Sequence, residues 1–314
     1  MNIGEKHSLL YADRKRIQLN SWNIGHGNKI LHLLFLLNLA EKSGAIPVIP
    51  CESSLDEIFD LSNIRKEVPE KETGECIYTE TTAFPSLRGM QKLIAKFGIR
   101  PLTEKNLVAA IQQSSMQAEE ELDLLNSNLQ LKGKGYVRGH FWHHGLMPGE
   151  EVFLKYISVK PSLIAKCLRA YPGIENPDAV MVHLRDTDFR DHLRHVFKTP
   201  ITLPEEYYQK AIALTEKLLG SNVTYHLFSD NPEKITSLFQ GRKFVMHNNP
   251  APMDWACIYL GKNVIQSNSS FCWTASLFGK QFSIQPKGGY NWAKADKGSV
   301  PYGFRMPFSK EIAC

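Results

Sequence analysis

Short apolar runs alternate with polar turns along the chain and predict an alternation of strands and helices. The clearest run is 179–182, four apolar residues that stop abruptly at a charged group, and it predicts a buried strand. The same pattern predicts strands at 46–49, 223–228, 243–246 and 263–266 and helices at 30–42, 104–125, 161–170, 205–219, 254–260 and 271–279. Strand, turn and helix recur with polar residues after each strand, which is typical of a doubly wound α/β domain.

The pattern also predicts two domains. A chain of 314 residues exceeds one typical core, and proline and glycine concentrate at 171–177. We therefore expect an N-terminal α/β domain over 1–172 and a C-terminal nucleotide-binding α/β domain with a tail over 173–314.

Composition narrows the class of protein. Hydrophobic content of 43%, charged content of 22% and a formal charge of +5 suit a soluble enzyme of an anionic small substrate and do not indicate nucleic-acid binding. No apolar run reaches the ~18 residues of a membrane span, and no signal-peptide core is visible. The six cysteines show no CxxC pair, so neither a zinc site nor a disulfide framework is indicated, and we expect a cytoplasmic location.

The charged group after the strand at 179–182 carries the clearest chemistry. In open α/β sheets, ligands bind at the carboxyl ends of strands, which places His183, Arg185 and Asp188 at such an edge. A guanidinium binds phosphate oxygens bidentately, so Arg185 is a candidate anion ligand. The alternative is structural, because Arg185 could equally form an ion pair with Asp186 or Asp188 within the turn.

Three further segments are candidates for ligand contact. Gly25, Gly27 and Asn28 precede an apolar helix, where free N–H groups and the helix dipole favour an anion, although the glycines could simply allow a tight turn. The serines and asparagine at 267–270 predict a second helix start of this kind. Segment 135–145 mixes aromatic residues with histidines, which could stack on a sugar or base or form an ordinary half-buried strand.

Three motifs in the second half together resemble the bacterial α-1,2-fucosyltransferase family, which is related to the α-1,6- and protein O-fucosyltransferases. The segment 183–189, HLRDTDF, is similar to the family's His-x-Arg-Arg-Gly-Asp-Tyr, 228–231 to its Phe-Ser-Asp-Asp, and 268–274, NSSFCWT, to its Asn-Ser-Ser-Phe-Ser-Trp-Trp. Asp254 matches a family aspartate, 25–29 resembles its Gly-Leu-Gly-Asn-Gln, and 135–153 resembles a further family segment. The similarity spans most of the chain and is weakest between about 51 and 130.

The resemblance implies a GT-B glycosyltransferase, with two Rossmann-like domains facing a cleft. It would be inverting and would need no metal or other cofactor, transferring fucose from GDP-fucose to a hydroxyl of an oligosaccharide or glycoconjugate, as a galactoside 2-α-L-fucosyltransferase does. Carried over by motif, Arg185 would hold the β-phosphate together with Ser269, Ser270 and the Phe271 amide, within the motif that begins at Asn268. Gly27 and Asn28 would approach the diphosphate.

The remaining roles also follow from the resemblance. Asp230 or Asp254 would contact the base or ribose, and His183 or Asp188 would be the general base.

The chain departs from the family motifs at several positions, of which four bear on the predicted chemistry. Asp186 replaces the second arginine and Thr187 the glycine, which should weaken binding of a diphosphate or change which group is contacted. Lys29 replaces a glutamine and could restore the lost charge, and Thr274 replaces the second tryptophan.

These departures keep three alternatives open beside the fucosyltransferase. The first is a glycosyltransferase with another nucleotide sugar, and the second is a silent nucleotide- or glycan-binding protein of the same fold. The third is a metal-dependent phosphate-ester hydrolase that uses His183, Asp186 and Asp188.

Overall fold

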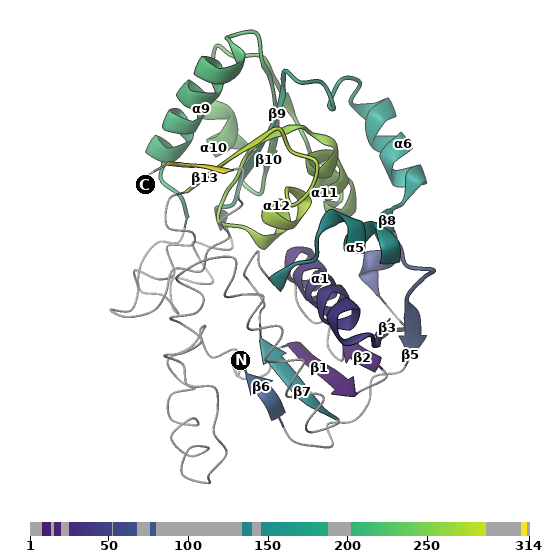
Figure 1. The fold of residues 1–314 in the computed structure, drawn as a ribbon. Helices are drawn as coiled ribbons and strands as arrows, with labels where there is room; N and C mark the ends of the chain where they lie inside the picture. The colour runs from purple at the N-terminus through teal and green to yellow at the C-terminus, as the bar shows by residue number, and fades with distance from the viewer. Residues whose placement is uncertain are drawn as a thin grey trace, which may run out of the picture. The chain divides into compact units, whose positions relative to one another are not determined.

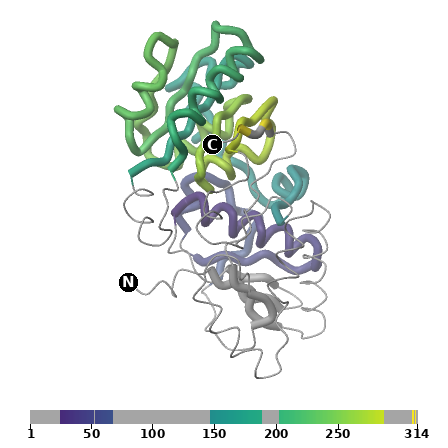
Figure 2. Tube along the Cα trace, turned by 90° about the vertical axis from the view of Figure 1, so that its left-hand side faces the viewer, coloured from purple at the N-terminus to yellow at the C-terminus, as the bar shows by residue number. Residues whose placement is uncertain are grey.

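The computed structural model divides the chain into two compact units, Met1–Ser158 and Val159–Cys314. It describes residues 25–51, 53–67, 146–187 and 202–286, and the strands at 8–13, 16–19, 76–79, 134–139 and 309–312. The predicted helix at 104–125, the segment 140–145 and Asp188 lie outside these residues. The predicted division at 172/173 lies within the second unit, after helix α6 (Pro161–Ala170). Figure 2 traces the chain.

Within the described residues, the first unit contains a six-stranded mixed sheet in the order β5-β3-β2-β1-β7-β6 (Figure 1). β1 runs antiparallel to both of its neighbours, whereas the other pairs are parallel. The sheet strands are β1 (Ser8–Asp13), β2 (Arg16–Leu19), β3 (Ile46–Pro50), β5 (Arg65–Glu67), β6 (Cys76–Thr79) and β7 (Lys134–Gly139). The other elements are η2 (Ser54–Glu57), β4 (Phe59–Asp60), α5 (Glu150–Tyr156) and β8 (Ser158–Val159).

Helix α1 (His26–Ser43) connects β2 to the parallel strand β3, so the predicted βαβ unit is confirmed. Gly44 ends the helix at φ 67°, a left-handed conformation that glycine adopts at little cost, and its N–H reaches the carbonyls of Ala40 and Glu41. The apolar residues of α1 are buried on nearly all sides. Its polar Asn38 is satisfied, because Nδ2 donates to the carbonyl oxygens of Leu146 (2.9 Å) and Met147 (3.2 Å).

The second unit contains an all-parallel sheet in the order β11-β10-β9-β12-β13-β14. Numbered from β9, this is the Rossmann order 3-2-1-4-5-6, whose direction reverses between β9 and β12. The predicted α/β class is thereby confirmed. The strands are β9 (Ala179–Leu184), β10 (Thr224–Ser229), β11 (Phe244–Met246), β12 (Asn263–Ile265), β13 (Phe282–Pro286) and β14 (Ser309–Ile312).

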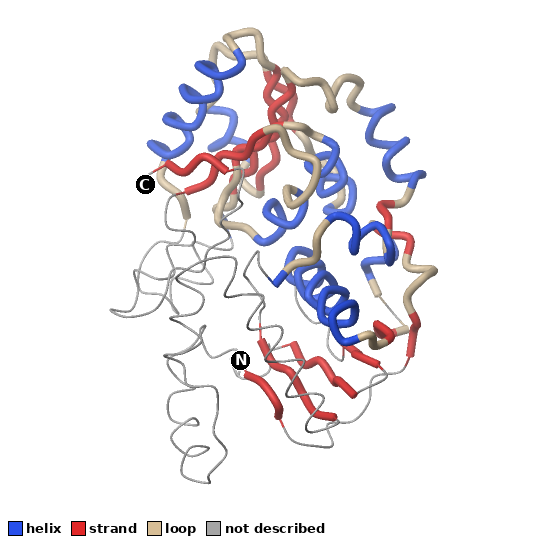
Figure 3. The backbone as a smooth tube through the Cα atoms, in the orientation of Figure 1, coloured by secondary structure: helices blue, strands red, loops and turns tan. Residues whose placement is uncertain are grey.

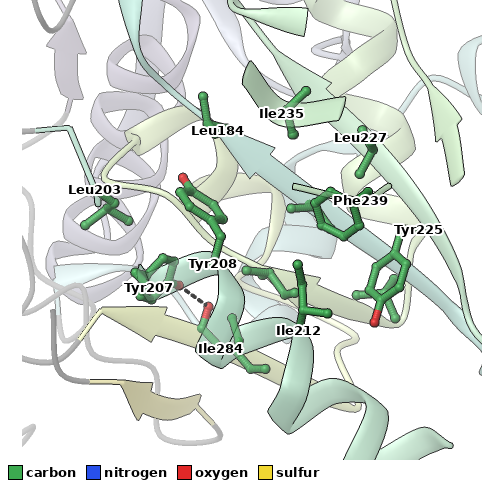
Figure 4. Packing of buried hydrophobic residues seen from close by; sticks show 14 of the residues in the cluster. Leu184, Leu203, Tyr207, Tyr208, Ile212, Tyr225, Leu227, Ile235, Phe239 and Ile284 are labelled. Atoms are coloured by element: carbon green, nitrogen blue, oxygen red, sulfur yellow. Dashed lines mark hydrogen bonds between the residues drawn. The ribbon is translucent and has the colours of Figure 1, made fainter. Parts of the chain in front are cut away.

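Helices cover both faces of this sheet, as Figure 3 shows. The helices of the unit are α9 (Glu205–Leu219), α10 (Pro232–Ser237), α11 (Ala251–Leu260), α12 (Ser270–Ala275) and α6, which packs against α11. The alternation of side chains along β9 assigns its residues to the two faces. Val180, Val182 and Leu184 belong to a core that includes residues of α9 and α10 (Figure 4). Met181 points to the opposite side, where a Cβ on Gly261 would overlap its side chain.

Two tyrosines of α9 reach from this core to the strand ends. The Tyr207 hydroxyl donates to the carbonyl of Gln266 (2.7 Å) and lies 3.1 Å from that of Ile284, the contact drawn in Figure 4. The Tyr208 hydroxyl donates to the carbonyl of His183 (3.2 Å). Both rings are fully buried, so the two hydroxyls tie the carboxyl ends of β9, β12 and β13 to one helix.

Most predicted elements of the second unit are present, and the largest boundary shifts are those of α11 and α12. α11 begins at Ala251, before the predicted 254, because the prolines at its start are compatible with a first helical turn. α12 ends at Ala275, before the predicted 279. No described helix is both long and apolar enough to cross a membrane.

Candidate functional site

At the reversal point of the second sheet, a short side-chain contact links the end of β9 to the segment after β12. His183, on β9, lies on the face opposite Leu184, and its Nδ1 is 2.6 Å from the hydroxyl oxygen of Ser267, just beyond β12. The His183 ring also lies 5.9 Å from that of Phe271. In an open α/β sheet this reversal point is where a ligand binds. We call the four residues gathered there the switch-point cluster: His183, Arg185, Asp230 and Ser267.

The imidazole of His183 is neutral at pH 7. Burial, the larger cause, and the nearby Arg185 cation together lower its pKa to about 3, against the opposing effect of Asp230. A group with this pKa is a poor proton acceptor near neutral pH, which weakens its candidacy as the general base.

Arg185 occupies the rim of the cluster. Its side chain is 35% exposed, and its Nε lies 3.7 Å from an oxygen of Asp230. Asp186, one of the two partners considered for a structural ion pair, directs its carboxylate to Lys234. The partner expected in Asp188 lies outside the described residues. The structure thus places a half-exposed guanidinium at the reversal point.

The carboxylate of Asp230 holds the turn that follows β9. It accepts hydrogen bonds from the N–H of Asp186 (2.9 Å), the N–H of Thr187 (3.1 Å) and the hydroxyl of Thr187 (2.9 Å). Asp230 therefore fixes the backbone that carries Arg185. A direct contact of Asp230 with a nucleotide stays a prediction.

Asp186 and Thr187, the two residues that depart from the family motif in this turn, both form hydrogen bonds with neighbouring side chains. Asp186 is 2% exposed, and its oxygens accept hydrogen bonds from Lys234 Nζ and Asn231 Nδ2, both at 2.8 Å. Its negative charge is thus balanced by a cation of α10 and is directed away from solvent. The Thr187 hydroxyl is bonded to Asp230. We expected these substitutions to weaken anion binding. Because Asp186 is buried and paired with Lys234, its negative charge should have little effect on an anion at the reversal point.

The segment from Ser267 to Phe271 forms the other side of the reversal point. Asn268 and Ser269 are buried, whereas Ser270 and Phe271 are partly exposed. Ser269 is the N-cap of α12, but its hydroxyl makes no capping hydrogen bond, unlike the predicted serine cap. Its carbonyl accepts from the N–H of Trp273 (3.0 Å). Ser269 and the start of α12 thus follow β12 at the carboxyl end of that strand.

Asp254 lies in a separate group of polar side chains. We call this group the histidine-pair cluster: Tyr171, His226, His247, Asn249 and Asp254. Asp254 accepts a hydrogen bond from Asn249 Nδ2 (2.9 Å), and Asn249 Oδ1 accepts one from the Tyr171 hydroxyl (3.0 Å). Burial raises the pKa of Asp254 to about 6, against the opposing effect of Asn249. The predicted contact of Asp254 with the base or ribose stays a prediction.

The predicted glycine turn belongs to the first unit. Gly25 is the N-cap of α1 and offers no side chain, Gly27 is buried and Asn28 is partly exposed. Lys29 Nζ donates to the hydroxyl of Ser54 at 2.9 Å. Burial lowers the pKa of the neighbouring His26, with Lys29 adding to the shift. The predicted contact of Gly27 and Asn28 with a diphosphate stays a prediction.

Sequence reasoning included Ser267 only as part of a predicted helix start, and it missed Lys234 and Tyr208. Ser267 directly precedes the matched motif at 268–274, so its position was a usable signal. The partnership of Lys234 with Asp186 spans 48 positions, and no local pattern indicates it. Across the residues that the structure describes, no group of three or more His, Cys, Asp and Glu side chains comes together as a metal site.

No known family profile matches the chain, and no curated protein matches it by sequence. Solved structures do resemble it. The fucosyltransferase NodZ from Bradyrhizobium is 15% identical, with a TM-score of 0.44 over 81% of this chain and 88% of that chain. POFUT1 in complex with GDP-fucose is 11% identical, with a TM-score of 0.42 over 82% and 93%. A family 9 glycosyl transferase from Veillonella parvula is 9% identical, with a TM-score of 0.48 over 96% and 88%. Identities and TM-scores this low carry no residue role over to this chain.

Proposed function

We propose that the protein is an inverting glycosyltransferase that moves fucose from GDP-fucose to a glycan hydroxyl in an α-1,2 linkage. One observation carries the proposal: the matched motifs meet at the reversal point of a Rossmann-ordered sheet, with Arg185 and the start of α12 at the same edge. A diphosphate is the ligand for which this edge is chemically suited, since it pairs with a guanidinium and accepts from serine hydroxyls and backbone N–H groups.

In the proposed reaction, an acceptor hydroxyl attacks the anomeric carbon of the donor. The bond from that carbon to the β-phosphate oxygen breaks, GDP leaves with the bonding electrons, and the hydroxyl proton passes to a base. Negative charge grows on the leaving diphosphate, and Arg185 with the hydroxyls of Ser269 and Ser270 would stabilise it there. We propose that no metal ion is required for this step.

The identity of the base is the open part of the mechanism. His183 is neutral but has a pKa of about 3, which argues against it. Asp188 remains the other candidate from the motif, although the structure does not describe it.

A thermal-shift screen against GDP, UDP, CDP and ADP tests the donor. A ligand at roughly 100-fold excess over its Kd stabilises the folded state by about 2.7 kcal/mol. We expect selective stabilisation by GDP, followed by release of GDP from GDP-fucose when a galactose-terminated oligosaccharide is added. Stabilisation by UDP alone would keep a glycosyltransferase and discard fucose. Transfer that survives EDTA would support the metal-free step, whereas a large loss would contradict it.

The second candidate is a protein of the same fold that binds a nucleotide or glycan but catalyses no transfer. The ion pair between Asp186 and Lys234 bears on this candidate. Asp186 replaces the second arginine of the family motif, and Lys234 balances its negative charge. This balance favours retained nucleotide binding but says nothing about turnover. Stabilisation by GDP without transfer to any acceptor would favour this candidate. No stabilisation by any nucleotide would overturn both.

A further inference from the structure

We propose that Ser267 is a positioning residue for His183: its hydroxyl donates to Nδ1, holding the ring as the neutral tautomer that carries its proton on Nε2. His183 would then present an N–H donor to the ligand and would not act as a base. The inference builds on the proposed function for its catalytic meaning, but the tautomer itself can be measured without any ligand.

The contact is short and enclosed. Nδ1 and the hydroxyl oxygen are 2.6 Å apart, and each residue is only 6% exposed. The Phe271 ring lies 5.9 Å from the imidazole, and the Tyr208 hydroxyl donates to the His183 carbonyl. Groups from α12 and α9 thus flank the ring and hold the backbone of His183.

The direction of the hydrogen bond follows from the accounting of donors. A neutral imidazole has one donor nitrogen and one acceptor nitrogen, and a serine hydroxyl has one proton to place. Among the described residues, the ring of His183 is the only hydrogen-bond partner of the Ser267 hydroxyl. If Nδ1 carried the proton, the buried Ser267 hydroxyl would lack an acceptor, which costs about 1–3 kcal/mol. Donation from Ser267 to Nδ1 satisfies both groups.

The charges around the ring keep it neutral. Arg185 follows two positions later and disfavours an imidazolium, and burial acts in the same direction. Asp230 acts in the opposite direction but is engaged with Arg185 and the turn N–H groups. A neutral ring held in this tautomer can donate through Nε2 and cannot accept the acceptor's proton there. The proton of the reaction must then pass to another group.

The test is the nitrogen NMR spectrum of full-length protein labelled with ¹⁵N-histidine. His183→Phe identifies the His183 signals. Between pH 6 and 8 we expect an unprotonated Nδ1 and a protonated Nε2 in the wild type. A protonated Nδ1, or a doubly protonated ring at pH 7, would overturn the proposal, and neither result depends on the donor.

Variants then assign the effect to Ser267. In Ser267→Ala we expect the single tautomer to be lost, and in Ser267→Thr, which keeps the hydroxyl, we expect it to be retained. Ser276→Ala is the matched control, because Ser276 is also buried but donates to the carbonyl of Cys272, so its loss should leave the His183 signals unchanged. An unchanged tautomer in Ser267→Ala would remove Ser267 from this role. If Ser267→Ala does not fold, the wild-type spectrum and Ser267→Thr still decide.

Kinetics connect the tautomer to the reaction. If GDP-fucose is the donor, Ser267→Ala should lower kcat roughly tenfold, the equivalent of one lost hydrogen bond, with a smaller change in the donor KM. A change in KM alone would mean that the pair serves ground-state binding and would contradict a role for the N–H donor in the transition state. Absence of turnover in the wild type would count against the proposed function and leave the spectroscopic result standing.

Discussion

The switch-point cluster and the histidine-pair cluster are similar in composition but differ in which of their groups reach the surface. Both collect polar side chains from neighbouring strands and the segments that join them to helices, and both contain a buried histidine with a lowered pKa. In the histidine-pair cluster, His226 Nδ1 lies 2.9 Å from His247 Nε2, and the Tyr171 ring lies 3.9 Å from that of His247. Asn249 then connects Tyr171 to Asp254. These contacts are all between protein groups.

The switch-point cluster differs because a cation and a helix start lie at its rim. Arg185 is partly exposed, and so are Ser270 and Phe271 at the start of α12. The difference shows that polar residues after a strand predict where a polar cluster lies but not what it does. The function of such a cluster depends on whether neighbouring elements satisfy all of its hydrogen bonds or leave charged groups at the surface.

The largest effect expected concerns the ion pair that supports the switch-point turn. Lys234→Met should leave Asp186 buried without its cation and destabilise the protein by about 3 kcal/mol or more. Urea unfolding measures the change. Lys217→Met, at an exposed position of α9, is the matched control. The double variant Asp186→Asn/Lys234→Met should recover part of the loss. A Lys234→Met cost no greater than that of Lys217→Met would show that the pair contributes little.

Arg185→Ala tests the exposed side of the comparison. We expect transfer to fall roughly 100-fold or more, because a preorganised charge at the leaving group is removed. The thermal transition should barely move, because the guanidinium lies at the rim. Arg169→Ala, an equal truncation at an exposed position of α6, should leave both unchanged. Unfolding of Arg185→Ala would favour the structural ion-pair interpretation.

The histidine-pair cluster should make stability depend on pH. Burial lowers the pKa of His226 to about 4 and of His247 to about 3, so below pH 6.5 the unfolded chain binds protons that the folded protein excludes. Stability should therefore fall as the pH drops from 6.5 toward 4, by up to about 1.4 kcal/mol per pH unit for one such group. Asp254 acts in the opposite sense between its usual 3.8 and about 6, because its folded state holds the extra proton.

Urea unfolding of the wild type and of His226→Phe/His247→Phe at pH 8, 6 and 4.5 measures this dependence. Replacing both partners avoids leaving one ring nitrogen buried without its contact. We expect a shallower loss of stability toward low pH in the double variant, with the remainder coming from His183 and other groups. Parallel curves for the two proteins would show that the pair does not exclude protons.

The smallest effects expected concern the α9 tyrosines. Tyr208→Phe removes one hydrogen bond to the His183 carbonyl and should cost about 1 kcal/mol. Tyr207→Phe should cost somewhat more, because its hydroxyl lies within reach of two carbonyls, those of Gln266 and Ile284. Thermal unfolding measures both. Tyr208→Phe should shift the His183 nitrogen signals more than Tyr207→Phe does, because the Tyr208 hydroxyl donates to the His183 carbonyl.

Local patterns by themselves determined the order and type of most elements in the second unit. The apolar run at 179–182 is part of β9, and the helix predicted at 205–219 is α9 with the same bounds. The C-cap at Gly44 was also evident from the sequence. Each of these rests on contacts within a few positions of the chain, or on burial that repeats with the period of a strand or helix. The sequence also placed Arg185 and the motif at 268–274 at strand ends.

Only the tertiary structure decided which of these residues meet. His183 and Ser267 are 84 positions apart, and Asp186 and Lys234 are 48 apart. Their contacts exist because β9 lies between β10 and β12, an order that local periodicity does not encode. The same order turned Asp186 inward to Lys234, made Asp230 a support for the turn, and separated Asp254 into the histidine-pair cluster. Side-chain type predicted the chemistry available, whereas strand order decided which groups are neutralised inside the protein and which remain for a ligand.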